Sequence, residues 1–202
     1  MAFGGSDQVN DTLTVPTSLK IVVAGGFGVG KTTMVNSVSE IPPLRTEEVL
    51  TEASVGVDDM QGIEGKETTT VALDFGRITI NPQVVLYLFG TPGQNRFWFM
   101  WDELAHGALG AIVLVDTRRL DSSFPSIDFF ERRDIPFVVA VNGFDGAWDH
   151  TVDEVRQALD IEPTVPVVKC DARTRESSKG VLVELVQYTM AQLEQRAPAR
   201  QS

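Results

Sequence analysis

The chain has 202 residues, of which 43% are hydrophobic, and a formal net charge of -11 at pH 7. This length allows one domain with a full core, and the negative charge disfavours binding to nucleic acid or to anionic lipid. Cys170 is the only cysteine, which excludes an intramolecular disulfide and a multi-cysteine metal site. A single thiol suits a reducing compartment, so we expect a cytoplasmic protein.

The two ends of the chain read as flexible tails, residues 1–17 and 197–202, around one domain at 18–196. The first residues lack a basic start followed by an apolar stretch, so they do not resemble a secretory signal. No apolar run is long enough to cross a bilayer. We therefore expect no direct insertion into a membrane, although a partner could recruit the protein to one.

Apolar runs alternate with amphipathic stretches along the chain, which is typical of strands joined by crossover helices. A turn at Asn81-Pro82 predicts a hairpin whose first strand lies nearer an edge of the sheet. Residues 41–68 are polar with weak periodicity and are expected to form a long surface segment. The predicted fold class is α/β, a mostly parallel doubly wound sheet with one antiparallel edge strand. The expected strands are Leu19–Ala24, Thr70–Ile80, Val84–Phe89, Ala111–Val115, Phe137–Val141 and Val165–Val168; the expected helices are Thr32–Glu40, Trp101–Ala108, Phe124–Arg132, Val152–Leu159 and Gly180–Gln195.

A glycine-rich segment between the first strand and the first helix has the spacing of a phosphate-binding loop. Its glycines allow a tight turn that aims backbone amides at phosphate oxygens, and the following helix adds its positive end. Lys31 is expected to reach the β- and γ-phosphates and Thr32 to ligate Mg²⁺. The alternative is a glycine turn followed by an ordinary surface lysine. The expected nucleotide contacts in this segment are Gly25, Gly26, Phe27, Gly28, Val29, Gly30, Lys31, Thr32 and Thr33.

Three later apolar runs end in polar residues, and parallel sheets bind ligands at the carboxyl ends of their strands. One of these ends, Asn142-Gly143-Phe144-Asp145, resembles the Asn-Lys-x-Asp motif of small GTPases. In that motif the aspartate accepts two hydrogen bonds from guanine that adenine cannot supply, so such a carboxylate selects guanine. The alternative is a common strand-terminal turn.

The resemblance extends over residues 19–193 in the motif order of the Ras superfamily. Thr91-Pro92-Gly93-Gln94 is similar to the switch II motif, and Cys170-Asp171-Ala172-Arg173 stands at the place of the final base loop. The segments Thr70–Gly76 and Leu88–Gln94 resemble the bacterial branch that contains the gliding-motility GTPase MglA and the actinobacterial conservon GTPases.

This resemblance implies a GTP/GDP switch with Mg²⁺ that hydrolyses GTP slowly and signals to proteins. Gln94 is expected to orient the attacking water and Gly93 to sense the γ-phosphate. In switch I, Thr70 is the expected Mg²⁺ ligand, with Thr68 and Thr69 as alternatives. The implied partners are roadblock-type proteins and a sensor-kinase-like membrane protein.

Three positions depart from the family pattern. Gly90 replaces the aspartate that begins switch II, and Gly143 replaces the lysine of the base motif, which is expected to weaken Mg²⁺ and nucleotide binding. Phe27 would crowd an arginine inserted by a partner. Arg77 and Arg96 are the candidates for a catalytic arginine within the chain.

Two other functions remain possible on the sequence alone. One is a module that binds a guanine nucleotide without hydrolysing it, which the two glycine replacements motivate. The other is a P-loop ATPase or small-molecule kinase, which would prefer adenine and carry an arginine-rich lid. Residues 41–68 contain a single arginine, Arg45, which disfavours such a lid.

Overall fold

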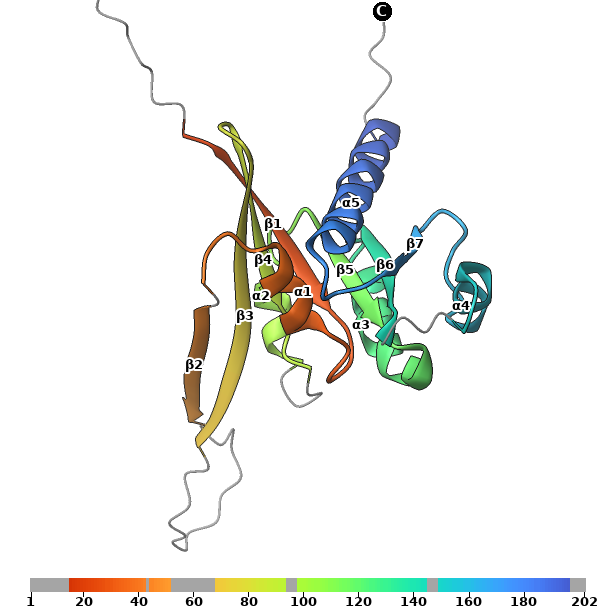
Figure 1. Ribbon diagram of the computed structural model, residues 1–202, viewed down its shortest axis with the longest axis horizontal. Coiled ribbons are helices and arrows are strands. Elements are labelled where there is room, and N and C mark those ends of the chain that lie inside the picture. The colour runs from red at the N-terminus through yellow and green to blue at the C-terminus, as the bar shows by residue number, and fades with distance from the viewer. Residues whose placement is uncertain (1–14, 43, 52–67, 94–97, 145–148, 197–202) are drawn as a thin grey trace, which may run out of the picture.

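A central strand, β1 (Thr17–Ala24), is flanked on both sides in a seven-stranded sheet of order β2-β3-β4-β1-β5-β6-β7 (Figure 1). The computed structural model describes residues 15–42, 44–51, 68–93, 98–144 and 149–196. β1 pairs in parallel with β4 and β5, and the parallel order continues to β7. The other strands are β2 (Leu44–Thr51), β3 (Thr68–Asn81), β4 (Val84–Gly90), β5 (Gly110–Val115), β6 (Phe137–Asn142) and β7 (Val167–Cys170).

Helices cover both faces of this sheet, as expected for a doubly wound α/β fold (Figure 1). The first core contains side chains from α1 and α5, and the second contains side chains from α3 and α4. The helices are α1 (Lys31–Val38), α2 (Met100–Ala105), α3 (Phe124–Arg132), α4 (Val152–Ala158) and α5 (Arg175–Arg196), with a 3₁₀ segment η2 (Thr117–Ser123) before α3.

Alternation along the strands explains the two cores. Ile21 and Val23 of β1 lie in the first core, whereas Val22 and Ala24 lie in the second. Successive side chains of a strand point to opposite faces, and a strand buried on both faces therefore reads as a continuous apolar run. The predicted strands and helices are thus confirmed, with ends that differ by a few residues.

Residues 44–51 contradict the expectation of a long surface segment. They form β2, which pairs antiparallel with β3 from Leu44 opposite Phe75 to Thr51 opposite Thr68. The sequence of β2 has only weak periodicity, so it does not predict a strand. The segment is extended because it pairs with the edge of β3. The predicted antiparallel strand is β3, and β2 covers its outer side, so β3 is next to the edge.

The N-terminal part of α5 and all of η2 were also absent from the expected elements. α5 begins at Arg175, five residues before the expected start. The apolar pattern did not predict this first turn because its residues are polar. η2 follows β5 directly and contains a kink at Arg119. Both begin at the carboxyl edge of the sheet, where the candidate site lies.

Candidate functional site

The turn from β1 into α1 forms the floor of the site. Gly25 and Gly30 have positive φ values of 135° and 107°. A Cβ on Gly25 would lie 2.4 Å from the Leu114 carbonyl oxygen, and one on Gly30 would lie 2.7 Å from the Asn142 side-chain nitrogen. Both positions therefore require glycine, for conformation and for space. The amide of Met34 then bonds the Gly30 carbonyl at 2.8 Å, which starts the regular helix.

Lys31 lies inside this turn. Its side chain is only 7% exposed, and Nζ donates to the carbonyl oxygens of Gly25 at 2.9 Å and Gly26 at 2.8 Å. Burial lowers the pKa of Lys31 to about 8, and the negative charge of Asp74 opposes the shift. A buried ammonium at a helix N-terminus is suited to binding a polyphosphate.

Thr32 meets a carboxylate from a neighbouring part of the sheet. Its Oγ1 donates to Oδ2 of Asp74 on β3 at 2.6 Å. Asp74 pairs with Gly90 across the β3–β4 ladder, and a Cβ on Gly90 would lie 2.9 Å from the Asp74 Cβ. The space next to Thr32 that a side chain at position 90 would fill is thus taken by Asp74.

A hydroxyl and a carboxylate at this place form a donor set that suits Mg²⁺, which prefers oxygen ligands and is commonly bound by one or two carboxylates together with substrate phosphates. Thr32 and Asp74 are therefore the residues that would hold the ion. The loss of an aspartate at Gly90 does not leave the site without a carboxylate.

Gly93 approaches the same turn from above. A Cβ on Gly93 would lie 2.8 Å from Lys31 Nζ and 3.0 Å from the Phe27 Cα. The amide of Thr91 donates to the Val23 carbonyl at 2.9 Å, which extends β4 toward the glycine turn. The structure thus brings the predicted switch II glycine next to the predicted phosphate loop.

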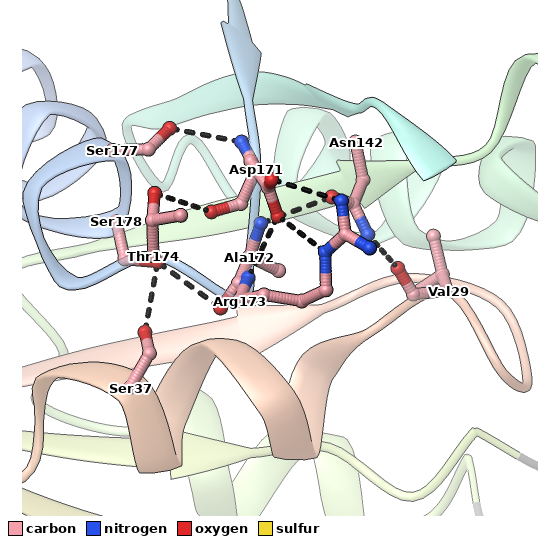
Figure 2. A network of polar contacts seen from close by, with 9 residues as sticks. All are labelled: Val29, Ser37, Asn142, Asp171, Ala172, Arg173, Thr174, Ser177 and Ser178. Atoms are coloured by element: carbon pink, nitrogen blue, oxygen red, sulfur yellow. Dashed lines mark hydrogen bonds and ion pairs between the residues drawn. The ribbon is translucent and has the colours of Figure 1, made fainter. Parts of the chain in front are cut away.

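Asn142 joins this turn to the end of β7, as Figure 2 shows. Its Nδ2 donates to the Val29 carbonyl at 3.0 Å, and its Oδ1 accepts from the Ala172 amide at 3.1 Å. The side chain is buried, and both ends of its amide group have partners. Two predicted ligand loops, far apart in sequence, are therefore held together by one residue.

The loop after β7 is itself ordered by short-range bonds (Figure 2). Asp171 accepts from the backbone amide and from the guanidinium of Arg173, each at 3.0 Å, and these bonds hold the pKa of Asp171 below its usual range. Ser177 accepts from the Asp171 amide at 2.8 Å, and Ser178 bonds Ser37 of α1 at 2.9 Å. Arg173 stays a candidate ligand contact, whereas Ala172 is buried and its amide already donates to Asn142.

Cys170 contributes to the site through its main chain. Its carbonyl accepts from the Gly143 amide at 2.8 Å, whereas its thiol is buried. Burial raises the pKa of the thiol to about 11. The residue is therefore a structural connection between the two base-side loops and not a reactive group.

One predicted site residue, Thr70, lies away from this centre, and three others fall outside the described part of the chain. Gln94, Arg96 and Asp145 lie outside the described residues. Thr70 pairs with Val49 and lies four positions along β3 from Asp74, a separation of roughly 13 Å at the usual rise of a strand. Its role as a metal ligand stays a prediction.

Arg77 is the remaining candidate for a catalytic arginine within the described residues. It is three positions from Asp74 on β3, so it faces the opposite side of the sheet. The geometry does not support a role for Arg77 at the phosphate turn.

Sequence reasoning missed Asp74 as a site residue, and it placed Asp116 only among the polar residues that follow a strand at the ligand-binding edge of the sheet. Asp74 is a lone carboxylate in an otherwise apolar and hydroxyl-rich strand, which is a signal that could have identified it. Asp116 follows β5 directly and is only 1% exposed. It lies at the carboxyl edge of the sheet, where ligands bind in such folds.

This arrangement defines a P-loop nucleotide-binding protein with the G-domain fold. The chain belongs to the family described as conserved hypothetical ATP binding protein, whose model matches residues 23–192. A relative from Methanocaldococcus jannaschii, uncharacterized protein MJ1339, is 30% identical over 129 residues, which are 63% of this chain and 71% of the relative.

Solved structures support the fold independently. The G domain of the T. maritima FeoB iron transporter matches with a TM-score of 0.59 at 20% identity, covering 85% of this chain and 99% of that one. The FeoB G domain of Methanococcus jannaschii matches with a TM-score of 0.57 at 16% identity, covering 86% and 98%. At these identities the likeness establishes the fold alone.

Two features are absent from the part of the chain that the structure describes. None of its helices combines the length and apolar character needed to cross a membrane. No group of three or more His, Cys, Asp or Glu side chains within that part is arranged to hold a metal ion. A cation at Thr32 and Asp74 would therefore need further oxygen ligands from the nucleotide and water.

Proposed function

We propose that this protein is a Mg²⁺-dependent GTP-binding switch that hydrolyses GTP slowly. The observation that carries the proposal is Asn142, whose amide bonds Val29 of the phosphate loop and Ala172 of the loop after β7. It would hold the proposed phosphate-binding part and the proposed base-binding part together at one edge of the sheet. A nucleotide is the ligand class that needs both.

Guanine is proposed as the base because Asp145 follows Asn142 at the spacing of the guanine-selective motif. The family's description favours adenine instead, so an ATP-binding protein is the second candidate. The two candidates differ in whether guanine or adenine nucleotides bind more tightly.

The test is equilibrium binding of labelled GDP, GTP, ADP and ATP to the wild type, to Asp145→Ala and to Asp149→Ala as the matched control. We expect guanine nucleotides to bind and Asp145→Ala to lose at least about tenfold in their affinity, since the guanine donors lose their acceptor. Asp149 is exposed four positions later, and its replacement should change nothing. Equal or tighter adenine binding by the wild type would contradict the guanine assignment.

Mg²⁺ is proposed to bind at Thr32 and Asp74, where it would neutralise charge on the β- and γ-phosphates. We expect Asp74→Ala to raise the Mg²⁺ concentration needed for half-maximal GTP binding about tenfold, because the ion would lose the carboxylate of its proposed donor set. Titration of GTP binding with Mg²⁺ measures this.

A relocated carboxylate provides the matched rescue. A side chain at position 90 would collide with Asp74, so the Gly90→Asp variant should bind Mg²⁺ and GTP poorly. The double variant Gly90→Asp, Asp74→Gly should recover most of the Mg²⁺ dependence of GTP binding. A Mg²⁺ titration of Asp74→Ala that matches the wild type would refute this site.

Hydrolysis is proposed to depend on Gln94, which would orient the attacking water. Single-turnover GTP hydrolysis by the wild type and by Gln94→Leu tests this, with a slow wild-type rate and a lower rate in the variant as the expected result. A wild-type rate equal to the uncatalysed background would favour the binding module without hydrolysis.

Signalling is proposed to use the segment that follows Gly93. Trp98 is 65% exposed and Phe99 is 52% exposed, directly before α2, and exposed aromatic side chains of this kind mark partner surfaces. Roadblock-type proteins and a sensor-kinase-like membrane protein are the proposed partners, with the protein itself in the cytoplasm, as the bacterial MglA and conservon branch implies. Pull-down with a non-hydrolysable GTP analogue or with GDP should recover such a partner in one state only.

A further inference from the structure

A buried carboxylate at the end of β5 holds two arginines. Asp116 accepts from the Arg118 backbone amide at 3.0 Å and from its Nε and Nη2, both at 2.9 Å. Arg119 Nη2 lies 3.6 Å from Oδ2, the oxygen that also accepts from Arg118 Nη2. The bonds from Arg118 hold the pKa of Asp116 below its usual range, so the group stays ionised although it is buried. A buried charge of this kind is retained only when it is well paired.

Arg119 connects this carboxylate to the phosphate loop. Its Nη2 donates to the Phe27 carbonyl at 3.1 Å. Beside it, Ser122 Oγ donates to the Arg119 carbonyl at 2.8 Å and lies so close to Gly26 that a Cβ there would be 2.4 Å away. η2 therefore packs directly against residues 26 and 27 of the phosphate loop.

Arg118 connects the same carboxylate to residues 142–144, the base-side turn at the end of β6. Its guanidinium carbon lies 4.0 Å from the centre of the Phe144 ring, a distance at which a cation over an aromatic face is attracted. Phe144 comes two positions after Asn142. Between them, Gly143 has no side chain that could reach the phosphate loop.

We propose that Asp116, Arg118 and Arg119 form a positioning unit, the arginine clamp, that holds the phosphate loop and the base-side turn at the spacing one nucleotide needs. Arg119 acts on the phosphate side and Arg118 on the base side, with Asp116 as their common anchor. The inference rests on the proposed function in that the shared ligand is a nucleotide. The arginine clamp connects the phosphate loop to residues 142–144, a connection that Gly143 cannot make because it has no side chain.

Substitution of Arg119 and substitution of Arg118 should lower the affinities for different nucleotides. A general loss of stability would lower all of these affinities alike. Arg119→Gln should lower GDP affinity about tenfold while changing GMP affinity at most about twofold, because only the diphosphate uses the part of the loop at Phe27. Arg118→Gln should lower GDP and GMP affinity by similar factors and should reduce the preference for GDP over IDP, which lacks the guanine 2-amino group. Arg119→Lys, which keeps the charge, should recover part of the GDP affinity.

The matched control is Arg132→Gln, an exposed arginine paired with Asp128 on α3. It should leave all three affinities unchanged. Equal losses for GDP, GMP and IDP in both clamp variants, or no loss in either, would overturn the clamp.

Hydrogen exchange of the nucleotide-free protein separates failure of the clamp from failure of the proposed function. Arg119→Gln should speed exchange at residues 25–30 at least about threefold and leave 142–144 unchanged, and Arg118→Gln should do the reverse. If the wild type binds adenine instead, the guanine assignment fails, yet ADP and AMP still test the Arg119 arm. Unchanged exchange in both segments would refute the clamp whichever base is bound.

Discussion

At the scale of single residues, Lys31 determines how the phosphate turn handles charge. Its ammonium donates to two carbonyl oxygens. Burial lowers its pKa to about 8, and the negative charge of Asp74 opposes this shift. Bound phosphates would stabilise the charged form and raise this pKa. Nucleotide binding is therefore linked to proton uptake wherever the free lysine is partly neutral.

We expect GDP affinity to be constant below pH 8 and to fall above it, by up to tenfold per pH unit, until the higher pKa of the complex is reached. The sign follows because the complex holds more protons than the free protein only above the lower pKa. Binding measured between pH 7 and 9.5 checks this, with Lys31→Met expected to bind weakly and to lose the dependence. A flat wild-type profile would show that Lys31 is charged throughout in the free protein.

At the scale of elements, a helix can be fixed both by a local signal and by packing. α4 shows both. Thr151 accepts from the Glu154 amide at 3.2 Å, and Glu154 in turn accepts from the Thr151 amide at 2.7 Å, which is a complete capping box. Val155 and Leu159 then pack into the second core.

Thr151→Ala should lower the free energy of unfolding by about 1 kcal/mol, the usual effect of removing an N-cap hydroxyl. Urea denaturation measures the change. Thr164→Ala, at an exposed threonine beyond the helix, serves as the control and should stay within about 0.5 kcal/mol of the wild type. Equal effects of the two substitutions would mean that the cap does not contribute.

At the scale of the whole molecule, two cores sandwich one sheet, and the site lies where their loops meet. α5 spans the first core: Leu185 is fully buried, whereas Leu193, two turns later, is 59% exposed. The same residue type on one helix therefore has two environments. Stability should follow burial and not residue type.

Leu185→Ala should destabilise the fold by about 2–5 kcal/mol, because it removes buried methylene groups and leaves a cavity. Leu193→Ala should change the free energy of unfolding by less than about 0.5 kcal/mol in the same denaturation experiment. Similar losses for both would indicate that the end of α5 is covered by another molecule in solution.

The sequence by itself determined the fold class, the phosphate turn from Gly25 to Thr32, and the order of the helices and strands other than β2 and η2. These features depend on local patterns: apolar period, glycine spacing, and a strand followed directly by a helix. Asn142 was also found from sequence, because it follows an apolar strand in a recognisable motif. The link from Asn142 to Val29 and Ala172 became visible only in the fold.

Only the tertiary structure decided the partners that are distant in sequence. Asp74 reaches Thr32 because β3 pairs with β4 in a register that sets it beside Gly90, and Asp116 serves both loops because β5 lies next to β1. β2 exists because β3 has a free edge to pair with. Strand order and register are set by the packing of the whole sheet, so no local window of the sequence contains these contacts.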